Sequence, residues 1–220
     1  MSTERVSIMK RFDFSNGIVI ATEWISRLAI ANLMWLMCSL PIVTLIPATN
    51  ALFHLFAVWS KGEDTPSTAK TFWHSFKNQF WDSYKAGGLV CGVLVVLLLD
   101  SWILTLLAQT QAWLHIYKYV LYITTILFSL TSLFYFPLTK KLSGTVPKQL
   151  LTAFWLLIRH PVLSLLLAAA CILLVIVLLR FPALLFFFSG SGIAGLATMF
   201  TNKAIYHSNM RKKNKLPAEH

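Results

Sequence analysis

Six long apolar stretches, separated by short polar segments, dominate the chain. They cover residues 18–40, 42–59, 87–107, 119–136, 162–179 and 182–200. An α-helix needs about 20 apolar residues to cross the ~30 Å hydrocarbon core of a bilayer. The pattern therefore predicts an all-α, polytopic bundle of transmembrane helices that forms a single integral membrane domain over residues 1–220.

The second stretch is short and is bordered by two prolines. Pro41 and Pro47 favour a bend or a re-entrant hairpin between the first two segments. Segment 42–59 therefore either crosses the membrane or returns to the face from which it came.

Positive charge lies on one side of the six-crossing topology. In that topology 17 of the 19 Lys and Arg residues face one side, and Lys118 and Arg180 face the other. Cytoplasmic loops of membrane proteins carry the excess of Lys and Arg. The distribution favours a full crossing by segment 42–59. It predicts a multi-pass membrane protein with both termini in the cytoplasm and a basic cytoplasmic tail over residues 203–220.

Composition agrees with a membrane protein and narrows the function classes. Hydrophobic residues make up 57% of the chain and charged residues only 12%, against about 25% charged residues in soluble domains. Basic loops beside anionic lipid account for the net charge of +11, and their dispersal argues against nucleic-acid binding. The three cysteines lie in apolar stretches and predict no disulfide framework.

A more polar segment over residues 67–85 predicts an amphipathic helix. Its aromatic residues recur at helical spacing, with lysines at the margin of that face. Such a face favours a helix that lies flat at the headgroup level, and docking of a cytoplasmic partner is the alternative. The residues assigned to this interfacial or docking face are Phe72, Trp73, Phe76, Lys77 and Phe80.

A few polar residues lie inside the apolar stretches. A charge at the bilayer centre costs about 2.5–3.5 kcal/mol, so we expect Asp100 to face protein or water, to lie near the interface, or to be protonated. His54 is one of its expected partners. A structural role for Asp100 is favoured over a proton or cation site. Asn32 and Asn50 are further candidates for buried polar residues, and their expected role is hydrogen bonding between helices.

Small residues at helical spacing mark candidate packing faces. Gly88 and Gly92 open the third span, and Ser191 and Gly195 lie in the sixth. Small residues four apart allow helix backbones to approach closely. The pattern serves contacts inside the bundle and contacts with a partner protein equally well.

Signatures of catalysis and of metal binding are missing from the sequence. It contains no G-x-x-x-x-G-K-[ST], H-E-x-x-H, G-x-S-x-G or C-x-x-C motif. We therefore predict that the protein is not an enzyme and has no catalytic residues, no cofactor and no metal.

Several of these segments resemble one family. They are residues 32–36 (NLMWL), 41–49 (PIVTLIPAT), 51–53 (ALF) and 76–80 (FKNQF). The chain resembles the YesL-like integral membrane proteins of Gram-positive bacteria, which are grouped as domain of unknown function 624. The resemblance implies a plasma-membrane protein without assigned chemistry, whose relatives are commonly encoded beside carbohydrate ABC importers.

Three hypotheses of function follow. The first, which rests on the resemblance, is a non-enzymatic accessory protein for carbohydrate uptake that packs against the permease subunits of an ABC importer. The second is a small secondary transporter or channel in its own right. The third is a membrane scaffold or lipid-interacting protein. The lipid bilayer is the shared partner in all three.

Overall fold

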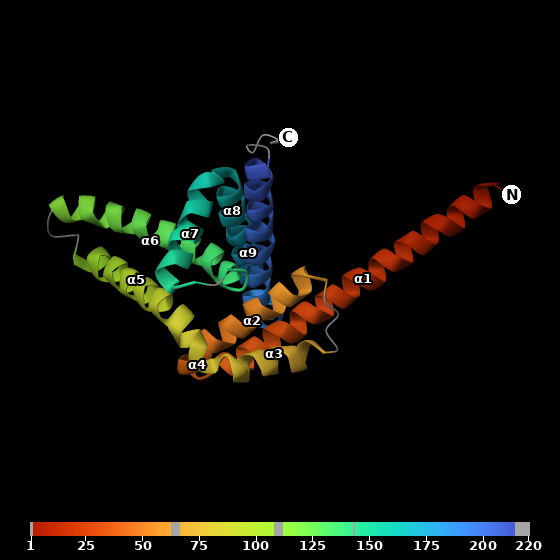
Figure 1. Cartoon of the computed structure of the whole chain (residues 1–220), viewed down its shortest axis with the longest axis horizontal. Helices are drawn as coiled ribbons and strands as arrows, with labels where there is room; N and C mark the ends of the chain where they lie inside the picture. Colours follow the sequence, from red (N-terminus) through yellow and green to blue (C-terminus); the bar gives the residue numbers. More distant parts are fainter. Residues whose placement is uncertain (1, 63–66, 108–111, 143, 214–220) are drawn as a thin grey trace, which may run out of the picture.

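The chain is built from helices throughout the part that the structure describes. The computed structural model describes residues 2–62, 67–107, 112–142 and 144–213, and these ranges contain no β-strand. The fold class is therefore confirmed as an all-α polytopic bundle. The elements in chain order are α1 (Ser2–Ser39), η1 (Ile42–Thr44), α2 (Leu45–Ser60), α3 (Thr68–Asn78), α4 (Phe80–Ser83), η2 (Tyr84–Gly88), α5 (Leu89–Leu107), α6 (Ala112–Thr139), α7 (Val146–Arg159), α8 (Pro161–Arg180) and α9 (Pro182–Lys213) (Figure 1).

Six stretches of the described helices are long and apolar enough to span a bilayer. They are Val19–Ser39, Ile42–Ser60, Leu89–Leu106, Ile116–Thr139, Pro161–Arg180 and Pro182–Met210. These agree with the six segments expected from hydropathy. The last helix continues beyond the expected span as far as Lys213, so much of the segment expected as a basic tail is helical.

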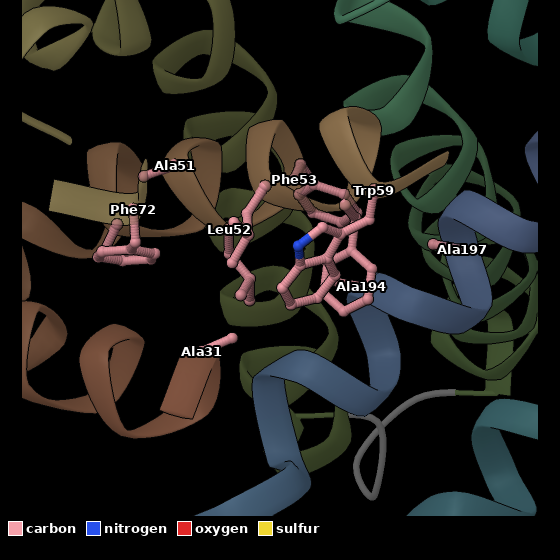
Figure 2. Packing of buried hydrophobic residues seen from close by; sticks show 11 residues of the cluster. Ala31, Ala51, Leu52, Phe53, Trp59, Phe72, Ala194 and Ala197 are labelled. Atoms are coloured by element: carbon pink, nitrogen blue, oxygen red, sulfur yellow. The ribbon is translucent and has the colours of Figure 1, made fainter. Parts of the chain in front are cut away.

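The short second segment is the centre of the bundle. In its most apolar window 56% of the residues are buried, against 11–33% for the other five candidate spans. Helices α1, α3, α6 and α9 all pack against α2. Figure 2 shows Leu52 and Phe53 of α2 among residues of α1, α3 and α9. The buried side chains that meet there are Ala31, Ala48, Ala51, Leu52, Phe53, Leu55, Phe56, Trp59, Phe72, Ala194 and Ala197.

A compact turn joins α1 to α2. The Thr44 hydroxyl donates to the backbone carbonyls of Cys38, at 2.6 Å, and Pro41, at 2.7 Å. Pro47 occupies the third position of α2, where the backbone N–H has no partner inside the helix, so the proline costs the helix no hydrogen bond. The chain therefore reverses within a few residues, and α2 returns beside α1.

The segment after α2 returns along it instead of lying apart from the bundle. Helix α3 packs against both α2 and α1. The Tyr84 hydroxyl, at the start of η2, donates to the carbonyl of Val43, which precedes α2. The predicted single helix over residues 67–85 is thus divided into α3, α4 and η2, and it runs beside α2 from end to end. Its exposed outer face carries Lys70, His74 and Lys77, together with the half-exposed ring of Trp73.

A second core joins the C-terminal half of the chain. Residues of α6, α7, α8 and α9 meet there, with Val90 from α5, and Phe134 and Tyr135 of α6 are fully buried. The α5–α6 hairpin projects from the rest of the molecule (Figure 1). Hydroxyl pairs tie its two helices together, with 3.3 Å between the oxygens of Ser101 and Thr125 and 2.7 Å between those of Thr105 and Tyr122.

Close contact between α1 and α9 depends on a glycine. A Cβ atom added at Gly190 would lie 2.7 Å from Cε3 of Trp35. The indole cannot retreat freely, because its N–H donates to the Thr49 hydroxyl at 3.2 Å. A Cβ added at Gly92 on α5 would meet nothing within 4 Å. The two glycines are therefore a matched pair, one packed and one open.

We predict that Gly190→Ala lowers the free energy of unfolding by about 1–2 kcal/mol, because overpacking displaces Trp35. Gly92→Ala should leave it unchanged or raise it by up to about 1 kcal/mol, because alanine favours the helix. Thermal unfolding in detergent, followed by tryptophan fluorescence, measures both variants. Equal stabilities for the two variants would contradict this account of the α1–α9 contact.

Candidate functional site

A polar cleft opens between α2, the α3–α4–η2 segment, and the α6–α7 connection. Its volume is about 490 Å³. We call this site the polar cleft. Its lining residues are Asn50, Gln79, Asp82, Lys85, Thr139, Lys140, Gly144, Thr145, Val146, Pro147 and Gln149. It combines amides, hydroxyls and charges beside the end of a membrane-spanning helix.

Irregular helix geometry brings polar side chains to this place. Gln79 separates α3 from α4, with φ −104° and ψ 15°, outside the helical range. After the four residues of α4 the chain enters η2, a π-helical turn over Tyr84–Gly88. Such turns interrupt regular α-helices and re-aim the side chains around them. A regular helix over residues 67–85 would not place Gln79 and Ser83 in their observed relation to α2.

A hydrogen-bond network links three helical segments across the cleft. The Asn50 amide nitrogen donates to the Ser83 hydroxyl at 2.6 Å and lies 3.4 Å from Oε1 of Gln79. The same Gln79 oxygen accepts a hydrogen bond from Nζ of Lys140 at 3.0 Å. Gln79 thus connects α2 with the end of α6.

Lys140 carries the charge that makes this site unusual. It directly follows the Ile116–Thr139 span, and burial lowers the pKa of its ammonium group to about 8. Among the described residues no carboxylate lies within ion-pair distance of Lys140. Asp82 in the same cleft pairs with Lys85, at 3.1 Å between Oδ1 and Nζ. The cleft therefore holds a positive charge that a neutral amide oxygen contacts and no acid balances.

A second contact shapes the loop beside Lys140. The side-chain amide of Gln149, in the second turn of α7, donates to the backbone carbonyl of Leu142 at 2.8 Å. Because both residues lie close to the α6–α7 connection, this bond holds the start of α7 beside the end of α6. The first turn of α7, with Thr145 to Pro147, consequently faces the cleft.

We predict that Lys140 makes the stability depend on pH. Its pKa is lower in the folded protein than in the unfolded chain, where it is near 10.4. Between about pH 8 and pH 10.5 the unfolded state then binds more protons, so the free energy of unfolding rises with pH. Thermal unfolding across this range should show the rise in the wild type and in a Lys70→Gln control, and a smaller rise in Lys140→Met. An identical pH profile for Lys140→Met and the wild type would contradict the assignment.

Asn32 lies fully buried where α1 meets α9. Its amide nitrogen donates to the carbonyl of Phe186 at 2.7 Å, and its amide oxygen accepts from the backbone N–H groups of Gly190, at 2.8 Å, and Ser191, at 2.9 Å. These contacts agree with the expected interhelical hydrogen bonding. They use both ends of the side-chain amide inside the bundle, so Asn32 has a structural role there.

The other two candidates for buried polar residues do not meet. The ring of His54 pairs through Nδ1 with the Ser75 hydroxyl of α3 at 2.7 Å. Asp100 lies on α5 with its side chain exposed. Of the alternatives expected for Asp100, a side chain that faces protein does not fit the described chain, because the face of α5 that packs against α6 carries Ser101 and Leu104 instead.

The aromatic residues of the amphipathic segment divide between two environments. Phe72 is fully buried against α2, and Phe76 and Phe80 are half-buried. Trp73 is 53% exposed, and Lys77 is also exposed. Phe72 is thus part of the core and is not available for docking, which corrects its assignment to a free interfacial face.

The two pairs of small residues differ in whether other side chains pack against them. Ser191 is fully buried, and a Cβ on Gly195 would lie 3.1 Å from the ring of Phe56. This pair serves packing inside the bundle. Gly88 and Gly92 have nothing within 4 Å of an added Cβ, so the third-span pair leaves an open face on α5.

Sequence reasoning missed most of the polar cleft. Asn50 is the one lining residue that the sequence singles out as a buried polar candidate. Lys140 reads as an ordinary basic residue at a cytoplasmic boundary, and Gln79 falls on the polar side of the amphipathic pattern. The one sequence feature that could have pointed to the cleft is a lysine directly at the end of a span. The one-sided distribution of Lys and Arg explains a lysine at that position equally well.

Comparison with known proteins relates part of the chain to one family. Residues 28–101 match the family described as "Protein of unknown function, DUF624". The uncharacterized protein YesL of Bacillus subtilis (strain 168) is 26% identical over 93% of this chain and 97% of its own length. The chain is thus similar to the YesL-like DUF624 proteins. The matched region contains Asn50, Gln79, Asp82 and Lys85 of the cleft, whereas Lys140 lies outside it.

A second relative matches over a shorter part of the chain. The uncharacterized protein YteU of the same organism is 34% identical over 53% of this chain, and the match spans about half of YteU's length. No solved structure matches the chain. The comparisons thus agree with the expected YesL-like recognition, and both relatives are described as uncharacterized.

Proposed function

We propose that this YesL-like protein is a non-enzymatic protein of the plasma membrane that supports a carbohydrate ABC importer. The resemblance to the family supplies the class of partner. The absence of catalytic motifs from the sequence supports a role without chemistry of its own. The protein would act by binding the permease subunits within the membrane.

The open face of α5 is the observation that carries this proposal. Gly92 lies on α5 of the hairpin that projects from the bundle (Figure 1), and Gly88 directly precedes that helix; among the described residues no atom lies within 4 Å of a Cβ added to either glycine. The glycines of α9 already pack inside the molecule, so α5 offers the small-residue face that remains for a neighbouring helix. In lipid, helices associate through such close contacts.

The test is copurification of the tagged protein in mild detergent. We expect permease subunits to copurify with the wild type and to be lost with Gly92→Leu, which fills the open face. Leu98→Phe is the matched control, because it enlarges an exposed side chain on another side of the same helix. Absence of permease and ATPase subunits from the purified material, together with unchanged sugar uptake after deletion of the gene, would overturn the proposal.

The proposal includes an orientation with both termini in the cytoplasm. Two observations support it: the distribution of Lys and Arg, and the antiparallel packing of α1 and α9. Asn32 contacts the first third of α9, while Trp24 and Asn202 line one cavity. The N-terminal part of α1 and the C-terminal part of α9 therefore leave the bundle at the same end.

Labelling of single cysteines tests this orientation. In a background where Cys38, Cys91 and Cys171 are replaced by Ala, a membrane-impermeant maleimide should label neither Ser2→Cys nor Glu219→Cys in intact protoplasts. It should label both after permeabilisation. Labelling of Ser2→Cys from outside, with Glu219→Cys protected, would show an odd number of crossings.

A further inference from the structure

An apolar groove adjoins the polar cleft on the same pair of helices. It lies between α6 and α7, has a volume of about 410 Å³, and is almost entirely apolar. We call it the α6–α7 groove. Its lining residues are Thr124, Leu127, Phe128, Thr131, Pro147, Leu150, Leu151 and Phe154. Pro147 lines both the groove and the polar cleft, so the two sites are adjacent.

The two sites together have the polarity of an amphiphile. The polar end holds Lys140, whose ammonium group is balanced by no carboxylate among the described residues, since Asp82 pairs with Lys85. The first turn of α7 also faces this end, and the N-terminus of a helix carries partial positive charge. The apolar end follows α6 towards its middle. An anionic group with an attached hydrocarbon chain is complementary to both.

The position along α6 fits a lipid in a bilayer. Lys140 stands at the end of the membrane-spanning part of α6, where headgroups lie. From Thr124 to Thr139 the helix rises about 22 Å at 1.5 Å per residue, which exceeds half of the ~30 Å hydrocarbon core. The cleft and the groove together therefore reach far enough along α6 for an acyl chain that descends from the headgroup level.

We propose that the polar cleft and the α6–α7 groove form a binding site for one phospholipid with an anionic headgroup, whose phosphate lies against Lys140 and whose acyl chain lies in the groove. This site is independent of the importer proposal, because no described residue of α5 lines the cleft or the groove.

Native mass spectrometry of the detergent-purified full chain tests the headgroup. Phosphatidylglycerol should bind about tenfold or more tightly than phosphatidylcholine with the same acyl chains, because charge-assisted contacts to Lys140 favour a net anion. Lys140→Gln should lose this preference, and Lys140→Arg should keep it. Lys141→Gln is the matched control, since Lys141 is exposed and does not line the cleft.

A second arm tests the hydrocarbon chain. Leu151→Trp narrows the groove and should weaken binding of both phospholipids, whereas Ile158→Trp, equally exposed on α7 but outside the groove, should not. Glycerol 3-phosphate, the headgroup without chains, should not bind at concentrations where phosphatidylglycerol saturates.

Three results would overturn the proposal. The first is equal binding of the two phospholipids by the wild type. The second is the same loss of phosphatidylglycerol binding in Lys140→Gln and Lys141→Gln. The third is binding of glycerol 3-phosphate as tight as that of phosphatidylglycerol, with no effect of Leu151→Trp, which would show that the cleft takes a free phosphate and not a lipid.

Discussion

The hydrogen bonds between the Asn32 side chain and the backbone of α9 fix the arrangement on which the rest of the bundle depends. Lipid solvates apolar side chains as well as another helix does, so burial of hydrophobic surface does not by itself select helix partners in a membrane. Asn32 bonds to the carbonyl of Phe186 and the N–H of Gly190, two groups one helical turn apart. It therefore sets the register of α9 against α1, and with it the contact of Gly190 with Trp35. Helix α2 then packs in the angle between them.

The position of α2 has consequences for the depth of its neighbours. Helix α3 follows α2 along its length and turns Lys70, His74 and Lys77 outward. Charged side chains are costly in hydrocarbon, so the outer face of α3 lies where water or lipid headgroups reach it. A single layer of protein, helix α3, thus separates the deeply buried helix α2 from a polar environment. This explains how a short, proline-bordered segment can sit at the centre of a membrane protein without a full shell of lipid around it.

Hydropathy alone predicts the six apolar helices because each must satisfy the same length and polarity requirement. It also predicts the burial of Asn32, since an amide within a long apolar stretch needs partners. The same reasoning leaves the environment of Asp100 open, because span membership does not say which face of α5 meets α6. It fails for Phe72, because an aromatic face suits lipid, a partner and the protein core equally well. The polar cleft escapes prediction because it depends on a break at Gln79 and on tertiary contacts between Asn50, Gln79 and Lys140 that no local pattern encodes.

The π-helical turn η2 determines which side of α5 faces the bundle. A regular α-helix advances by about 100° per residue, so loss of one residue from Tyr84–Gly88 would rotate all of α5 by that angle relative to α3. Val90 and Ser101, which now point into protein, would then swing towards lipid. The number of residues in this turn is thus constrained more tightly than their type. A chain with one residue more or fewer there would have to pair α5 with α6 through a different set of side chains.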